Sequence, residues 1–142
     1  MEKKQSVKDI LEIPESYQRY LDEIYTITYK KKKGGWVSNK EIAEALSVKP
    51  ASVSGMLEKL KKKGLIQWEQ RKSIRLTKEG KEIAEHLTKV HSALNVFFEK
   101  VLKIEDKELI NNLSCQIEHH VSPEILKKFN EFLETYKDIK EE

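Results

Sequence analysis

The sequence has one cysteine and no long apolar segment, and each shortage excludes a class of protein. A lone cysteine, Cys115, cannot form an internal disulfide, which favours a reducing compartment and leaves the thiol for other chemistry. No segment approaches the roughly 20 apolar residues that span a bilayer, and the polar segment 1–8 has no hydrophobic stretch behind it. We therefore expect a cytoplasmic protein that makes no contact with a membrane.

Sequence motifs of enzymes are lacking as well. The chain contains no nucleophile motif and no glycine-rich loop of the kind that cradles a phosphate. Catalysis would instead require Cys115, Glu118 and a histidine to form a metal centre with an open coordination position. We therefore expect that the protein is not an enzyme.

Charged residues are abundant but unevenly distributed. They make up 36% of the 142 residues, beside 38% hydrophobic residues, a composition typical of a globular, helix-rich protein. Residues 1–80 hold 18 lysines and arginines against 11 acidic residues, whereas residues 81–142 hold 9 against 13. A basic N-terminal half indicates a polyanionic partner, although a solvated lysine-rich surface has the same signature.

Hydrophobic periodicity predicts three helices and a hairpin in the basic half. Apolar residues recur at helical spacing from about Ser16 until the lysine run 30–33. Ser38 and Glu41 form a capping box that opens a short second helix, and Pro50 suits the first position of a third helix that ends at Gly64. Two short strands are then expected at 65–69 and 73–76, joined by the basic turn 70–72.

The remaining sequence is predicted to be helical. Thr77 can cap a long helix that runs from Lys78 to about Val101. A further helix is expected from 105–106 to about His120. Ser122-Pro123 opens a last one, whose apolar residues are expected to face inward: Ile125, Leu126, Phe129, Phe132, Leu133 and Tyr136. The predicted fold is therefore mainly α, with a short two-stranded wing.

The predicted order of elements is that of a winged helix-turn-helix: a helix, a short helix, a turn, a third helix and a basic hairpin. In such a module the third helix enters the major groove by its N-terminal end, and the hairpin meets phosphates. The residues that we expect to contact DNA are Ser38, Lys49, Pro50, Ala51, Ser52, Ser54, Lys59, Arg71 and Lys72. A three-helix module used for protein contacts has the same order and stays an alternative.

A second pattern, Cys115-Gln116-Ile117-Glu118-His119-His120, carries potential metal ligands. On a helix, Cys115, Glu118 and His119 share one face because they are spaced i, i+3 and i+4. A thiolate, a carboxylate and an imidazole suit Fe²⁺, Mn²⁺, Co²⁺ or Zn²⁺ better than Mg²⁺ or Ca²⁺. Further ligands must come from elsewhere, and His91 and Asp22 are the best candidates.

These metal-ligand candidates also have a structural interpretation. Cysteine is often a small buried hydrophobic residue, and a Glu-His pair is more often at the surface than in a metal site. His91 could be a solvent-facing residue of the long helix. No spacing argument recruits His86 or His120.

From about Tyr17 to Tyr136 the chain resembles the diphtheria-toxin-repressor family of iron- and manganese-dependent regulators. The resemblance rests on several segments together, and no single one of them is specific. The matching segments are 20–25 (YLDEIY), 42–46 (IAEAL), 50–54 (PASVS), 76–80 (LTKEG), His91 with the apolar stretch 94–102, and 115–122 (CQIEHHVS).

The resemblance implies a metal-activated repressor that binds a palindromic operator in double-stranded DNA as a homodimer. Residues 1–79 would form the winged-helix domain, and residues 80–142 the long linking helix with the metal-binding and dimerisation helices. By position, the family's metal ligands match Asp22, His91, Cys115, Glu118 and His119. Cysteine at position 115 resembles the iron branch and the overall length resembles the manganese branch, so Fe²⁺ or Mn²⁺ is implied, with Zn²⁺ or Co²⁺ able to bind in vitro.

Three positions depart from the family pattern. Arg19 stands where the family supplies a methionine or carboxylate ligand, and a guanidinium cannot coordinate a metal. Asn95 and Asn111 replace stronger ligands of an ancillary site. The sequence therefore leaves open a second metal ion, a pairing of Arg19 with Asp22 or Glu118 that replaces part of the metal's charge, and a metal-independent winged-helix regulator.

Overall fold

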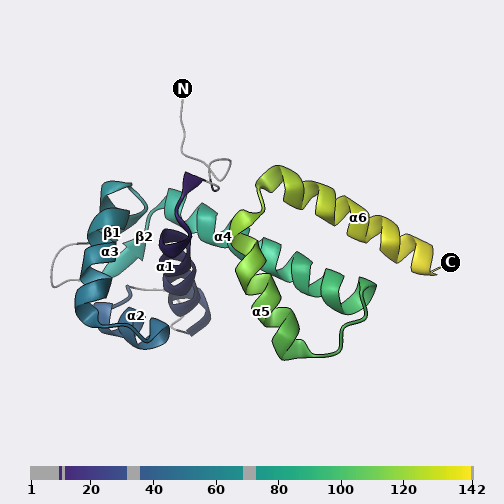
Figure 1. Cartoon of the computed structure of the whole chain (residues 1–142). Coiled ribbons are helices and arrows are strands. Elements are labelled where there is room, and N and C mark those ends of the chain that lie inside the picture. Colours follow the sequence, from purple (N-terminus) through teal and green to yellow (C-terminus); the bar gives the residue numbers. More distant parts are fainter. Residues whose placement is uncertain (1–9, 11, 32–35, 69–72, 142) are drawn as a thin grey trace, which may run out of the picture. The chain divides into compact units, whose positions relative to one another are not determined.

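The computed structural model describes residues 10, 12–31, 36–68 and 73–141 (Figure 1). The chain forms two compact units, one built mainly from Ile13–Glu85 and the other mainly from His86–Glu142. The boundary between them lies inside the long helix α4 (Lys78–Val96), six residues after the domain boundary expected from the sequence.

The N-terminal unit contains the predicted winged helix-turn-helix. Helix α1 (Glu15–Thr26) continues into a π-helical segment, Ile27–Lys31, and is followed by α2 (Asn39–Leu46) and α3 (Pro50–Lys62). Strands β1 (Ile66–Trp68) and β2 (Ile74–Leu76) then pair antiparallel. The core of this unit includes Leu21, Ile24, Val37, Ile42, Val53, Leu57, Leu60, Leu65, Ile74 and Ile83, all at most 3% exposed. The predicted order of elements is confirmed.

Local capping interactions set the bounds of the short helix α2. The Ser38 side chain accepts a hydrogen bond from the Glu41 N–H at 3.1 Å, and the Ser38 N–H donates to the Glu41 carboxylate at 2.9 Å. This is the capping box that the sequence predicted. Ser47 ends the helix in the left-handed conformation, with φ of 57°. The tight turn to Pro50, the first residue of α3, follows from these two caps.

The wing is tied to the helices at both of its ends. Val37 and Ile74 exchange backbone hydrogen bonds of 2.9 and 2.6 Å, which anchor β2 to the segment before α2. Thr77 caps α4 as expected, because its hydroxyl accepts from the Gly80 N–H at 3.2 Å. Gly80 is required within this helix because a Cβ there would collide with the Leu65 carbonyl oxygen. The predicted tip of the wing lies outside the described residues.

The described part of the C-terminal unit consists of helices and their connections, without a strand. The second half of α4 continues into a π-helical segment, Phe97–Val101, followed by α5 (Lys107–Ile117), a 3₁₀ turn at Glu118–His120 and α6 (Pro123–Glu141). Asp106 and Ser122 cap α5 and α6 by accepting from backbone N–H groups at 3.1 and 3.2 Å. The core consists of Val90, Ala93, Leu94 and Leu126, packed against Phe98, Ile117, Val121, Phe129 and Leu133.

The helix was expected to continue to about His120, and helical structure does end there, although its last turn, Glu118–His120, is 3₁₀ rather than α. The residue before a proline avoids the helical region, so the chain has to leave the helix before Ser122-Pro123, and Val121 is already extended. Ile125 and Phe132 were expected to face inward but are 54% and 45% exposed.

None of the helices within the described ranges is long and apolar enough to cross a membrane.

Candidate DNA interface and metal centre

The N-terminal end of α3 is accessible. Lys49, Pro50, Ala51 and Ser52 are all exposed, whereas Val53 on the opposite side is fully buried. The side chain of Lys49 makes no capping hydrogen bond to the helix. This end of α3 therefore presents backbone and short polar side chains to solvent, as a helix that inserts into the major groove requires.

Ser54 is held by a residue that the sequence did not suggest. The Asn39 side-chain amide, at the start of α2, donates to the Ser54 hydroxyl oxygen at 3.0 Å. The bond links the two helices of the helix-turn-helix and orients a predicted DNA-contacting side chain. Because the two residues lie 15 positions apart, no local sequence pattern could have indicated the pair.

Several cations of the N-terminal unit lie against aromatic rings. The Arg75 guanidinium lies 5.3 Å from the centre of the Trp36 ring, and the Lys63 ammonium lies 5.9 Å from the centre of the Tyr17 ring.

The remaining residues predicted to contact DNA lie in different parts of this unit. Lys59 is exposed on α3. Of the other residues predicted to contact DNA, Ser38 serves as the cap of α2, and Arg71 and Lys72 fall outside the described residues.

Three of the predicted metal ligands approach one another in the C-terminal unit. The Glu118 carboxylate, in the 3₁₀ turn, is only 3% exposed. One of its oxygens lies 2.8 Å from His91 Nδ1, on α4, and the other lies 3.7 Å from His119 Nε2. The buried carboxylate therefore lies between two imidazoles, and Cys115 is half-buried on α5.

Two asparagines connect α4 to α5 next to this carboxylate. The Asn111 side-chain oxygen lies 2.9 Å from His91 Nε2, and the Asn95 side-chain oxygen accepts from the Ser114 hydroxyl at 2.5 Å. These are the positions at which the sequence lacks the stronger ligands of an ancillary site. Hydrogen bonds between the helices occupy them instead.

The donor set of the C-terminal unit fits a divalent transition ion. Two imidazoles, a carboxylate and a thiol are the ligand types that Fe²⁺, Mn²⁺, Co²⁺ and Zn²⁺ take up in proteins. Among the described residues, no three histidine, cysteine or acidic side chains are already assembled in a coordinating arrangement. An ion would therefore have to exchange the contact between His91 and Glu118 for its own bonds.

The remaining predicted ligand and its neighbour lie on α1 of the N-terminal unit. Asp22 is half-buried there. Arg19 is exposed and pairs with Glu15 one helical turn earlier, at 2.5 Å. The sequence left open Asp22 or Glu118 as its partner, and within the N-terminal unit the structure pairs it with Glu15.

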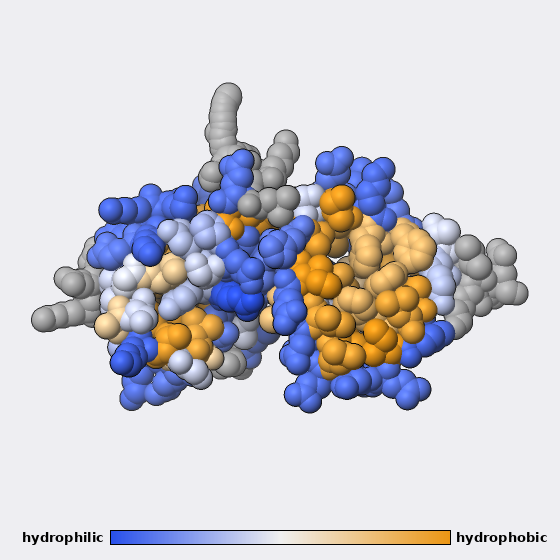
Figure 2. Space-filling model, in the orientation of Figure 1, coloured by the Kyte–Doolittle hydropathy of each residue, from blue (hydrophilic) through white to orange (hydrophobic). Residues whose placement is uncertain are grey.

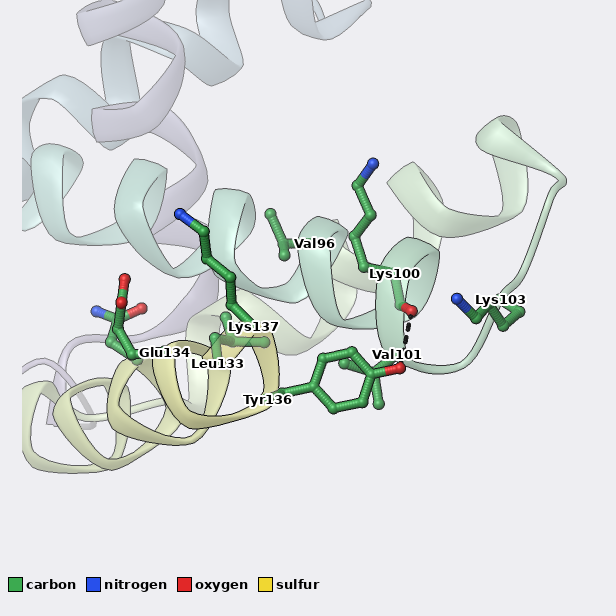
Figure 3. Close-up of a pocket in the computed structure, with 9 residues that line it drawn as sticks. Val96, Lys100, Val101, Lys103, Leu133, Glu134, Tyr136 and Lys137 are labelled. Carbon is green, nitrogen blue, oxygen red and sulfur yellow. Dashed lines mark hydrogen bonds between the residues drawn. The ribbon is translucent and has the colours of Figure 1, made fainter. Parts of the chain in front are cut away.

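A cavity of about 590 Å³ opens between the end of α4 and α6 (Figure 3). The Tyr136 hydroxyl bridges this region by donating to the Lys100 carbonyl oxygen at 3.4 Å. The residues that line the cavity are Val96, Lys100, Val101, Lys103, Asn130, Leu133, Glu134, Tyr136 and Lys137. The lining holds three lysines and none of the predicted metal ligands, so its charge does not suit a cation.

Comparisons with known proteins match both units. The model for the iron dependent repressor N-terminal DNA binding domain matches residues 12–74, and the model for the iron dependent repressor metal binding and dimerisation domain matches residues 77–139. An uncharacterized HTH-type transcriptional regulator of Methanocaldococcus jannaschii is 31% identical over 124 residues, which cover 87% of this chain and 97% of that protein. The chain belongs to the iron-dependent repressor family.

Solved structures of metal-dependent regulators have the same fold. The manganese regulator SloR is 31% identical, with a TM-score of 0.67 over 83% of this chain and 53% of its own. A manganese-dependent transcriptional repressor in complex with manganese is 25% identical, with a TM-score of 0.69 over 82% of this chain and 52% of its own. The chain thus spans about half the length of these two solved structures.

Membership in the iron-dependent repressor family confirms the function inferred from the sequence. The chain is a metal-dependent, DNA-binding transcriptional repressor with a dimerisation domain. The family consists of transcriptional regulators rather than enzymes. Its metal-binding domain covers the residues 77–139 that contain His91, Cys115, Glu118 and His119.

Proposed function

We propose that this repressor holds Fe²⁺ or Mn²⁺ through Asp22, His91, Cys115, Glu118 and His119, and that the loaded homodimer binds a palindromic operator. The observation that carries the proposal is the Glu118 carboxylate, 3% exposed, between the imidazoles of His91 and His119. A buried carboxylate is costly unless it is paired with a cation or strongly hydrogen-bonded. A divalent ion at this point would neutralise it, and Zn²⁺ or Co²⁺ would bind in vitro.

The residues of the proposed metal site have distinct tasks. Glu118 supplies negative charge in a place from which water is largely excluded. His91 and His119 supply neutral nitrogen donors, and Cys115 supplies a softer sulfur donor that favours transition ions over Mg²⁺ or Ca²⁺. A bound ion would supply a positive charge that donors on separate helices can share. Because Asp22 belongs to α1, its coordination would link metal binding to the DNA-binding unit.

The DNA-binding face that we propose is centred on the exposed N-terminal end of α3. Ser52 and Ser54 would read base edges, while lysines and the helix N-terminus would contact phosphates. The proposed contacts are Ser38, Lys49, Pro50, Ala51, Ser52, Ser54 and Lys59, with Arg71 and Lys72 on the wing. Because the proposed partner is double-stranded DNA, we expect the protein in the cytoplasm. As a member of a family of transcriptional regulators, it is expected to have no enzymatic activity.

Apolar surface on the C-terminal unit supports a homodimer. Hydrophobic side chains gather on the face of this unit that Figure 2 shows. The large hydrophobic residues that remain exposed in this unit are Val96, Leu102, Leu109, Ile125 and Phe132, each 42–54% accessible. An apolar patch of this kind is typical of a protein–protein interface. A two-fold dimer would supply the symmetry that a palindromic operator requires.

DNA pull-down from the source genome, with and without Mn²⁺ or anaerobic Fe²⁺, would identify the operator and test the proposal. Affinity for the recovered operator is then measured for wild type, Glu118→Gln and the control Glu108→Gln, which changes an exposed residue of α5. We expect metal to strengthen binding about 5- to 150-fold, the usual range of allosteric coupling, in wild type and the control but not in Glu118→Gln. Equal binding after chelation would favour the metal-independent regulator.

A further inference from the structure

We infer that Asn111 is a positioning residue for His91: its side-chain oxygen holds the Nε2–H of the ring, so that Nδ1 is the nitrogen presented to the metal. The inference rests on the proposed function, because it assumes that His91 is a ligand. It adds a residue that is not itself a ligand, and it specifies which ring nitrogen coordinates.

The two nitrogens of His91 face different surroundings. Nδ1 lies 2.8 Å from the Glu118 carboxylate, whose side chain is 3% exposed, on the buried side of the ring. Nε2 lies 2.9 Å from Asn111 Oδ1, at the solvent-exposed edge. The ring therefore bridges from the buried carboxylate to an amide on α5.

Only one orientation of the ring serves both contacts. A neutral imidazole donates from one nitrogen and coordinates through the other. The Glu118 carboxylate can only accept, so without an ion Nδ1 carries the hydrogen that faces it, and an ion that binds Nδ1 displaces this proton to solvent. The Asn111 oxygen also only accepts, so the hydrogen on Nε2 is retained there when Nδ1 coordinates. Turning the ring to present Nε2 would break the bond to Asn111 and direct Nδ1 away from Glu118.

Contacts of this kind tune metal sites. A coordinating histidine usually donates its other N–H to a carboxylate, carbonyl or water, and losing that partner weakens metal binding about 10- to 100-fold. The amide oxygen of Asn111 fills this position here. The Ser114 to Asn95 bond links the same two helices separately, so a change at Asn111 does not remove the connection between α4 and α5.

The test uses the full chain with Asn111→Leu, Asn111→Asp and the control Asn112→Leu. Asn112 is the exposed neighbouring asparagine, rotated about 100° around the helix from Asn111. Nitrogen NMR of the Zn²⁺-loaded protein with ¹⁵N-labelled histidine assigns the protonated and the coordinating nitrogen of His91. Calorimetry gives Zn²⁺ and Mn²⁺ affinities of each variant and of His91→Ala.

We expect a protonated Nε2 and a coordinating Nδ1 in wild type and Asn112→Leu. Asn111→Leu should bind each ion about 10- to 100-fold more weakly and lose the single tautomer, whereas Asn111→Asp, which keeps an oxygen acceptor, should retain both. Coordination through Nε2, or an unchanged spectrum and affinity in Asn111→Leu while His91→Ala binds weakly, would overturn this inference alone. Full metal affinity in His91→Ala would overturn the proposed site and, with it, this role of Asn111.

Discussion

The Nε2–H of His86 donates a hydrogen bond to the Val121 carbonyl oxygen at 2.7 Å. It ties α4 to the extended residue that follows the turn carrying Glu118 and His119. His86 is 6% exposed, and this burial lowers its pKa from the usual 6.5, while the bond to Val121 raises the pKa and the charge of Lys89 lowers it further. The sequence alone predicted no role for His86.

This pKa predicts how stability depends on pH. Because the pKa of His86 is lower in the folded chain than in the unfolded chain, the unfolded state binds more protons as pH falls through 6.5. The contribution of His86 is therefore intact above that pH and is lost below it, by at most about 1.4 kcal/mol per pH unit. Urea unfolding of metal-free protein at pH 5.5, 6.5 and 7.5 measures it.

The comparison is made with His86→Gln, whose amide nitrogen can still donate to Val121 but does not titrate. We expect the difference in unfolding free energy between this variant and wild type to change with pH below 6.5, in favour of the variant. His120→Gln changes an exposed histidine and serves as the control. A difference that stays constant over the three pH values would contradict the prediction.

Two glycines in helices should respond oppositely to alanine. A Cβ at Gly80 would collide with the Leu65 carbonyl, so Gly80→Ala should destabilise the N-terminal unit by about 1–3 kcal/mol, the usual cost of overpacking. Nothing lies within 4 Å of a Cβ at Gly55 in α3, so Gly55→Ala should stabilise by up to about 1 kcal/mol. Thermal and urea unfolding measure both changes. Equal effects at the two positions would show that backbone propensity, and not the contact with Leu65, decides them.

Asn39 should act on DNA binding through Ser54. Without the bond from Asn39, the Ser54 hydroxyl loses its orientation, so we expect Asn39→Ala and Ser54→Ala each to weaken operator binding by about 0.5–1.5 kcal/mol. Because the other polar atom of the Asn39 amide is buried without a hydrogen bond, removing the side chain also relieves a cost and should leave the fold intact. Fluorescence anisotropy over a double-mutant cycle tests the coupling. Additive effects in Asn39→Ala/Ser54→Ala would argue against it.

The sequence predicted the structural features that depend on interactions between residues close together in the chain. The capping box of Ser38 and Glu41, Pro50 at the start of α3 and the cap at Thr77 are local interactions, and all three are confirmed. Contacts between distant residues could not be read in the same way. Asn39 with Ser54 and His86 with Val121 are 15 and 35 positions apart and follow no periodicity.

The local geometry around the proposed metal ligands could be predicted only in part for the same reason. Cys115, Glu118 and His119 were grouped by assuming a regular α-helix, whereas the α-helix ends at Ile117 and Glu118–His120 form a 3₁₀ turn before the extended Val121. The helical pattern also failed to predict that Ile125 and Phe132 are exposed. Periodicity identifies an apolar residue but not whether this chain or a second copy covers it.

Cys115 should determine the preference among metals. A thiolate favours softer ions, so Cys115→Asp should shift relative affinity toward Mn²⁺ and away from Zn²⁺. Cys115→Ala is the control because it removes the sulfur without adding an oxygen, and it should weaken the binding of both ions. Competition titrations with a metal-sensitive dye give the ratio of affinities. An unchanged ratio in Cys115→Asp would show that the residue only packs.

Metal and operator should strengthen each other's binding by the same factor. If the ion increases operator affinity by restricting the DNA-binding units to conformations that match the operator, thermodynamic linkage requires the operator to tighten ion binding equally, by about 1–3 kcal/mol. Both quantities are measured on wild type, on His119→Ala and on the control His120→Ala, which changes the exposed neighbouring histidine. His119→Ala should lose the reciprocal effect and His120→Ala should keep it. Retention of the full effect in His119→Ala would show that the ion lies elsewhere, whereas unequal factors in wild type would mean that a further equilibrium, such as dimerisation, accompanies metal binding.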